Sequence, residues 1–183
     1  GLYGYSATDF SYMCAGCTKL TSLDISNLWG VIQPPCDTSY MFYGCTALTM
    51  APTLPATTLA EGRYSNMFHG CTRLATAPEL PATTLAKSCY KYLFQNCTSL
   101  VTPPALPATT LAEGCYGNMF QGCTSLASAP ELPATTLAYG CYRYMFDSCT
   151  SLRTAPSLPA TTLATSCYYC MFNKCTALQT LPV

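Results

Sequence analysis

Two short sequence blocks recur along this chain at a fixed interval, so its folding unit is far shorter than the chain itself. The motif Cys-Thr-x-Leu occurs seven times, with a first step of 28 residues and five further steps of 26. The block Leu-Pro-Ala-Thr-Thr-Leu-Ala occurs five times, beginning at Leu54, Leu80, Leu106, Leu132 and Leu158. Units of this length stack as coils, each packing on its neighbours. The 183 residues therefore predict one solenoid rather than two globular units.

The part of each unit that precedes the Cys-Thr motif is apolar at regular steps. In one copy, Leu111, Cys115, Met119 and Cys123 follow one another at four-residue intervals, with aromatic residues beside them. Such a stripe is typical of a helix with one buried face. Thr110 and Glu113 also have the spacing of a capping box. We therefore predict a short helix over 110–123 in this unit and its equivalent in the others.

The other part of the unit has a different character. Residues 126–137 contain two prolines, which are incompatible with the interior of a helix, and two β-branched threonines. We expect a short extended segment here, with strands of two to four residues stacked in parallel along the solenoid. A strand, a turn and a short helix within 26 residues is the plan of leucine-rich repeats. The predicted fold class is an α/β repeat solenoid, with short parallel strands on one face and short helices on the other.

The repeated residues also resemble a known family. The block Met-Phe-x-Gly-Cys-Thr-x-Leu is similar to the bacterial BspA-like leucine-rich repeats, and residues 20–27 resemble a closely related repeat type. The insert Ala-Pro-x-Leu-Pro-Ala-Thr-Thr departs from that pattern and lengthens the unit. The resemblance implies a secreted or surface-anchored bacterial protein that takes part in adhesion or host contact. It does not imply an enzyme.

The two ends of the chain differ from its middle. Residues 29–36 form an insertion in the first unit, and the residues before Cys17 match the repeat loosely. An end coil must cover its core with something other than a neighbour, so we predict an atypical N-terminal capping region over 1–44. Regular 26-residue repeats fill 45–183 of this single leucine-rich-repeat domain. We expect the sequence to be a segment of a longer chain.

Composition excludes several classes of partner. Only 9% of residues are charged and the formal net charge is zero, so nothing attracts nucleic-acid phosphate or an anionic membrane surface. No apolar run approaches the roughly 20 residues of a membrane-spanning helix, and we expect no membrane insertion.

The 14 cysteines are the most unusual feature of the composition. Besides those of the Cys-Thr motif, a second column is formed by Cys89, Cys115, Cys141 and Cys167. Their positions on the predicted helix face favour buried thiols that act as small apolar side chains, although disulfides remain an alternative. The two Cys-x-x-Cys pairs, Cys14/Cys17 and Cys167/Cys170, lie too many coils apart to share a zinc ion. We expect no metal and no cofactor.

Catalytic residues are not expected either. His69 is the single histidine, and its column is otherwise occupied by varied polar residues, which indicates an exposed surface position. Glu79 and Glu131 share a column two coils apart, at a separation of roughly 10 Å that would suit an inverting glycosidase. The ribbon predicted around them offers no cleft, so this pair does not support an enzyme.

Tyrosines and threonines also form columns. One tyrosine column comprises Tyr64, Tyr90, Tyr116, Tyr142 and Tyr168, and a second comprises Tyr40, Tyr92 and Tyr144. Stacked tyrosines bind sugars or proteins in some folds, but the first column is better explained as packing over the convex side of the helices. One hydroxyl of each Thr-Thr pair, such as Thr109-Thr110, is expected to bond to the backbone of the turn.

The position before each inward leucine is predicted to point out of the strand ribbon, because neighbouring side chains alternate faces. That column reads Thr53, Glu79, Ala105, Glu131 and Ser157. Together with Tyr92 and Tyr144, we select Thr53, Glu79, Glu131 and Ser157 as the candidate binding surface. The function expected from these features is binding of a host protein or a glycan by an extracellular or cell-surface bacterial domain. The alternative is a structural spacer that carries another module.

Overall fold

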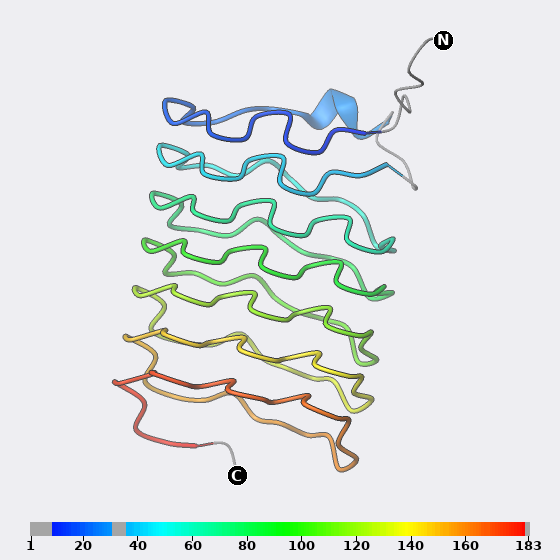
Figure 1. The fold of residues 1–183 in the computed structure, drawn as a ribbon, viewed down its shortest axis with the longest axis vertical. Coiled ribbons are helices and arrows are strands. Elements are labelled where there is room, and N and C mark those ends of the chain that lie inside the picture. Colours follow the sequence, from blue (N-terminus) through cyan, green and yellow to red (C-terminus); the bar gives the residue numbers. More distant parts are fainter. Residues whose placement is uncertain (1–8, 31–35, 182–183) are drawn as a thin grey trace.

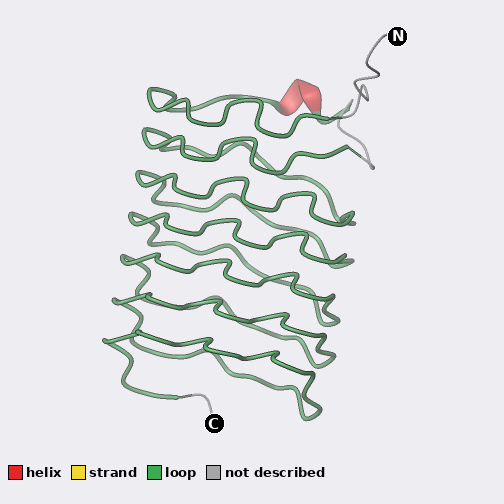
Figure 2. Cartoon of the chain, viewed as in Figure 1, coloured by secondary structure: helices red, strands yellow, loops and turns green. Residues whose placement is uncertain are grey.

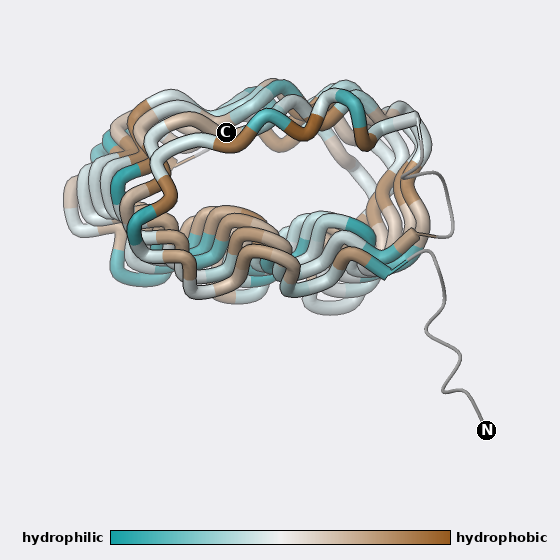
Figure 3. Tube along the Cα trace, turned by 90° about the horizontal axis from the view of Figure 1, so that it is seen from above, coloured by the Kyte–Doolittle hydropathy of each residue, from teal (hydrophilic) through white to brown (hydrophobic). Residues whose placement is uncertain are grey.

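The coils of the chain stack along one axis, as Figure 1 shows for the computed structural model. Residues 9–30 and 36–181 are described by this structure. Seen along the axis in Figure 3, each coil is a flattened ring with two long walls. Backbone bonds between coils connect each coil with the next, for example from the Tyr116 N–H to the Cys141 carbonyl (3.0 Å). The predicted repeat solenoid is therefore confirmed.

One long wall consists of consecutive turns, and we call it the turn wall. Its segments are 11–16, 39–44, 61–70, 87–96, 113–122, 139–148 and 165–174. The other long wall carries the Leu-Pro-Ala-Thr-Thr blocks, and we call it the proline wall. Its segments are 51–59, 77–85, 103–111, 129–137 and 155–163.

The turn wall contains none of the predicted short helices. Figure 2 shows one helix, the 3-10 helix η1 at Ser26–Leu28, among the described residues. In the turn wall, backbone N–H groups alternate between two kinds of partner. Tyr116 donates to the next coil, whereas the Met119 N–H donates locally to the Tyr116 carbonyl (3.2 Å). The chain is thus a string of overlapping turns, and the prediction of a helix over 110–123 is wrong.

The spacing of the apolar residues explains this difference. A helix advances about 100° per residue, so residues separated by a strict step of four drift around its surface. In the turn string every fourth residue adopts a left-handed conformation, as at Gly114, Asn118 and Gly122 (φ 57°, 57° and 73°). This geometry returns each fourth residue to the same face. Side chains consequently alternate as two inward and two outward, and the inward pair 119–120 is fully buried.

The proline wall contains isolated parallel bridges instead of the predicted strands of two to four residues. Within and next to the described segments of this wall, the bridges pair single threonines or serines of adjacent coils, for example Thr76 with Thr102 and Thr58 with Thr84. These bridges flank the prolines of each block at its two ends. Since proline has no N–H to donate, the ladder cannot extend between them. Two exposed threonines that follow the motif cysteines, Thr98 and Thr124, donate their hydroxyls to backbone carbonyls of adjacent coils (3.4 Å).

The core consists of columns of stacked aromatic rings. Phe120 lies between Phe94 and Phe146, with ring centroids 5.8 and 5.6 Å away. A parallel stack contains Tyr116, whose ring lies 5.8 Å from those of both neighbouring tyrosines. Tyr116 is 1% exposed. The first tyrosine column therefore lies inside the solenoid, and the prediction that it packs over an outer side is wrong.

The cysteine columns lie beside these rings as free thiols, and the described structure forms no disulfide among them. The thiol of Cys123 donates to the Phe94 carbonyl of the preceding coil (3.1 Å). Each motif cysteine from Cys71 to Cys175 repeats this contact. A thiol thus fills a small apolar space and supplies a donor to a carbonyl at the same time.

The N-terminal region predicted as a cap over 1–44 lies only partly within the described residues, since 1–8 and 31–35 fall outside them. The described part joins the stack through Asp9, which bridges to Asp37 of the next coil. Tyr12 stacks on Tyr40, with their ring centroids 4.5 Å apart.

Candidate functional site

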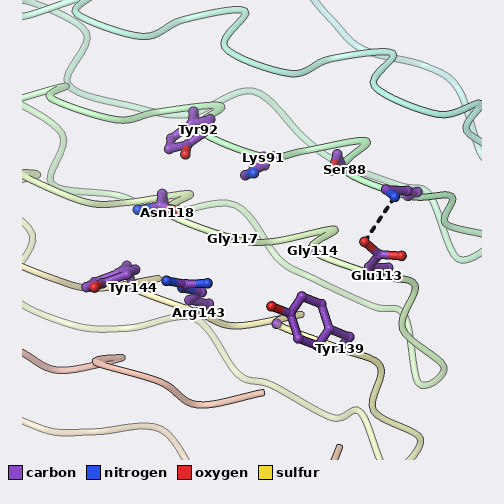
Figure 4. Close-up of a pocket in the computed structure, with 12 residues that line it drawn as sticks. Ser88, Lys91, Tyr92, Glu113, Gly114, Gly117, Asn118, Tyr139, Arg143 and Tyr144 are labelled. Atoms are coloured by element: carbon purple, nitrogen blue, oxygen red, sulfur yellow. Dashed lines mark ion pairs between the residues drawn. The ribbon is translucent and has the colours of Figure 1, made fainter. Parts of the chain in front are cut away.

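The outward pairs of the turn wall create a groove across three coils, which we call the turn-wall groove. Two consecutive pairs from each coil line it: 87–88 and 91–92, 113–114 and 117–118, and 139–140 and 143–144. Its volume is about 360 Å³. Figure 4 shows the small residues Gly114 and Gly117 in the middle coil, between larger side chains of the coils on either side.

Tyr92 and Tyr144 belong to the groove, as two of the six residues selected from the sequence. Both adopt left-handed backbone conformations (φ 60° and 54°) at the turn position that Asn118 occupies between them. Asparagine tolerates this region well, whereas a bulky aromatic residue rarely adopts it. Strained residues of this kind cluster at sites of function. The two tyrosines are half-buried and line the groove from opposite sides.

Two cations lie beside these tyrosines. The Lys91 ammonium is 5.1 Å from the centre of the Tyr92 ring, and the Arg143 guanidinium is 5.3 Å from that of Tyr144. Arg143 also lies 4.9 Å from the centre of the Tyr169 ring. A cation over an aromatic face is held in place without being neutralised. Among the described residues, neither Lys91 nor Arg143 forms an ion pair with a carboxylate.

Sequence reasoning missed the other residues that line this groove, among them Lys91, Gly117, Tyr139 and Arg143. The sequence contains a signal for them once the copies are aligned by turn position. Lys91, Gly117 and Arg143 share one column, so a residue without a side chain lies between two cations. Tyr139 occupies a column that is otherwise Glu61, Lys87, Glu113 and Thr165, and its side chain is 50% exposed.

The remaining selected residues lie on the proline wall. Thr53, Glu79, Glu131 and Ser157 are all exposed, as the predicted alternation requires. Thr53 and Glu79 line one shallow hollow of about 270 Å³, and Glu131 lines another of about 350 Å³. Prolines form much of the lining of both hollows. The six selected residues therefore belong to two separate surfaces.

The cysteine thiols offer little reactivity in the folded chain. Burial raises the pKa of the Cys71 thiol to about 12 and that of Cys89 to about 11. Burial also raises the pKa of Cys97 and Cys123 well above the ordinary value. Because the thiolate is the nucleophile and the metal ligand, these columns are chemically quiet. The described residues contain no group of three or more metal-ligating side chains.

His69 and its column form a polar ladder rather than an exposed row. The His69 ring is half-buried against Tyr43, with centroids 4.8 Å apart, and burial lowers its pKa. Further along the column, the Gln121 amide donates to Asp147 (2.6 Å), and the Asn173 amide donates to the other Asp147 oxygen (2.8 Å). The prediction of an exposed surface position for His69 is therefore wrong.

A stack of 26-residue coils with leucine, phenylalanine and cysteine columns inside is a solenoid of the leucine-rich-repeat class. The solved structure of a leucine-rich repeat protein from T. pallidum matches 92% of this chain and 70% of its own, with 21% identity and a TM-score of 0.53. A leucine-rich cell surface protein from Faecalibacterium prausnitzii A2-165 matches 92% of this chain and 67% of its own, with 18% identity and a TM-score of 0.35.

The comparison with the T. pallidum protein supports the fold and extends no further. No protein-family model matches the chain. No curated protein sequence matches it either. In the described residues, no helix is long and apolar enough to cross a membrane.

Proposed function

We propose that this chain is a non-enzymatic binding domain of a bacterial cell-surface or secreted protein of the BspA-like type, which recognises a host protein or a glycan. The observation that carries the proposal is the alternation of the turn wall. Because two of every four side chains point outward, successive coils project columns of variable residues onto one continuous surface. Solenoids commonly bind partners through such surfaces.

The core and the surface differ in a way that supports binding. Inward columns hardly vary, since Phe94, Phe120 and Phe146 repeat without change. The outward columns change from coil to coil, and on the turn wall they include four tyrosines in strained conformations, Tyr12, Tyr40, Tyr92 and Tyr144. A chain under selection only for stability would avoid such strain.

The second candidate function is a structural spacer, and one observation favours it. The aromatic columns run through the described coils with ring separations of 5.6 to 5.9 Å, which gives a stiff rod. A rod of this kind would hold another module away from a surface without binding anything itself.

Immobilising the chain and presenting glycans and extracellular-matrix proteins separates these two functions. Binding of a defined partner supports the first, whereas a folded chain that retains none supports the spacer. The double variant Glu79→Ala with Glu131→Ala tests the proline wall. We expect its melting temperature to stay nearly unchanged, because exposed single residues contribute little. Loss of partner binding in this variant assigns the site to the proline wall, and unchanged affinity moves it to the turn wall.

A further inference from the structure

We infer that the turn-wall groove binds an acidic saccharide, with a sugar carboxylate between Lys91 and Arg143 and a pyranose ring against Tyr139. This inference rests on the proposed binding function and narrows it to one site and one class of ligand. Four features of the groove carry it: its space, its charge, its exposed ring and its strained flanks.

The space comes from the middle coil. Its two outward pairs include Gly114 and Gly117. At the position equivalent to Gly117, the coils on either side carry Lys91 and Arg143. A Cβ on Gly117 would lie 3.7 Å from Cγ of Lys91, so the lysine stem extends over this glycine. The resulting volume of about 360 Å³ is within the range of small-ligand sites.

The charge of the groove is unusual for a chain with so few charged residues. Three cations and one carboxylate line it, and Lys87 is paired with Glu113 at 3.0 Å. Lys91 and Arg143 therefore remain as two positive charges that flank the same opening (Figure 4). A guanidinium and an ammonium together match a carboxylate in both charge and hydrogen-bond donors.

The exposed ring distinguishes a saccharide from a simple anion. Tyr139 is 50% exposed and forms part of the same coil as Arg143, at the rim of the groove (Figure 4). A tyrosine ring offers an apolar face to the C–H groups of a pyranose and a hydroxyl to its oxygens. The neighbouring copies place Glu113 and Thr165 at this position, so the ring is a local addition to the repeat.

The backbone of the groove argues against an extended acidic peptide. Such a peptide would add through main-chain hydrogen bonds, which need unpaired N–H groups. Here the Asn118 N–H donates to the Arg143 carbonyl (2.8 Å), and the Gly117 N–H donates to the Gly114 carbonyl (3.0 Å). Recognition at this site consequently depends on side chains, as it does for sugars.

The strained flanks provide a matched experiment. Tyr92 and Tyr144 (φ 60° and 54°) occupy the turn position where Asn66 and Asn118 stand in neighbouring coils. The double variant Tyr92→Asn with Tyr144→Asn relieves the backbone and removes one ring from beside each cation, while Tyr169 remains beside Arg143. We expect a melting temperature equal to or above that of the parent chain, together with weaker saccharide binding. A purely structural role for the tyrosines would instead lower the melting temperature.

The test uses a hexasaccharide of galacturonic acid as the probe and its methyl ester as the uncharged control. In isothermal titration, the parent chain is expected to bind the acid with an affinity that weakens as salt is added. It should bind the ester at least tenfold more weakly. Arg143→Gln and Tyr139→Thr should each weaken binding of the acid by roughly tenfold. Gly117→Tyr should fill the groove and abolish binding. Tyrosine already occurs in this column at Tyr169, in another coil.

Arg153→Gln, at an exposed arginine that lines neither the groove nor the hollows of the proline wall, serves as the control and should leave affinity unchanged. Equal binding of acid and ester, or full affinity in Gly117→Tyr and Arg143→Gln, would overturn the groove as an acidic-saccharide site. No binding of the hexasaccharide by the parent chain would also overturn it. The proposed function survives either result if the screen of glycans and matrix proteins finds another partner, and it fails separately if that screen is empty.

Discussion

Alkaline pH is expected to unfold this protein, because its core contains columns of thiols that stay protonated in the folded state. Eight of them are 0% exposed, among them the six thiols Cys71, Cys89, Cys97, Cys115, Cys123 and Cys149. Burial raises the pKa of each, to about 12 for Cys71 and about 11 for Cys89. In the unfolded chain a cysteine titrates near its ordinary pKa of about 8.5. The unfolded state therefore loses protons first as the pH rises.

The magnitude follows from linkage. A folded-state pKa above the unfolded one contributes stability that is fully present below about pH 8.5 and decreases as the pH rises toward the folded pKa. At about pH 9.5, one unit above the unfolded pKa, each buried thiol has lost about 1.4 kcal/mol. Six such thiols together remove about 8 kcal/mol, which is comparable to the whole stability of an ordinary domain. The buried Tyr90 and Tyr116, whose pKa values burial also raises, extend the loss above about pH 10.

Thermal melts in a strong reductant, at half-unit steps from about pH 7 to pH 10, measure this loss. The variant Cys97→Ser is the matched control. The Cys97 thiol donates to the Phe68 carbonyl (3.1 Å). A serine hydroxyl also offers a donor at this position, but it does not titrate in this pH range. We expect the variant to be less stable at neutral pH and to lose stability less steeply with pH. A melting temperature that stays constant up to about pH 10 would refute the reasoning.

Two further predictions concern the packing of single coils. Phe120→Ala should lower the free energy of unfolding by about 3–5 kcal/mol, because it removes a buried ring between two stacked neighbours. Phe172→Ala, in a half-buried terminal position, should cost about half as much. Equal losses for the two variants in guanidinium unfolding would contradict coil-by-coil packing. Gly122→Ala should cost about 1 kcal/mol, since Gly122 has φ +73° and a new Cβ would press on Asn96, whereas Gly30→Ala meets open space and should cost almost nothing.

The architecture could be predicted from the sequence because equivalent sequence units fold into equivalent coils. Two blocks recurring at 26 residues require equivalent coils, and the inward residues Leu111, Cys115, Met119 and Cys123 are buried as expected. Local structure was harder to predict, because a four-residue step resembles the helical period over one or two turns. The frequent recurrence of Gly, Asn or Ser at every fourth position, as at Gly62, Asn66 and Gly70, was the distinguishing signal. These residues tolerate the left-handed conformation that each turn of the string requires.

The candidate site was only partly predictable for the same reason. In a helix over 110–123, the polar residues would point in several directions around the helix axis. The sequence then does not show which polar side chains of adjacent coils lie next to one another. The turn string instead projects outward pairs in register, and this register brings Tyr92, Gly117 and Arg143 to one groove. Sequence columns therefore become surface neighbours only after the turn geometry is known. With that geometry, an exception within a column, such as Gly117 between two cations, identifies where the surface of the repeat departs from its pattern.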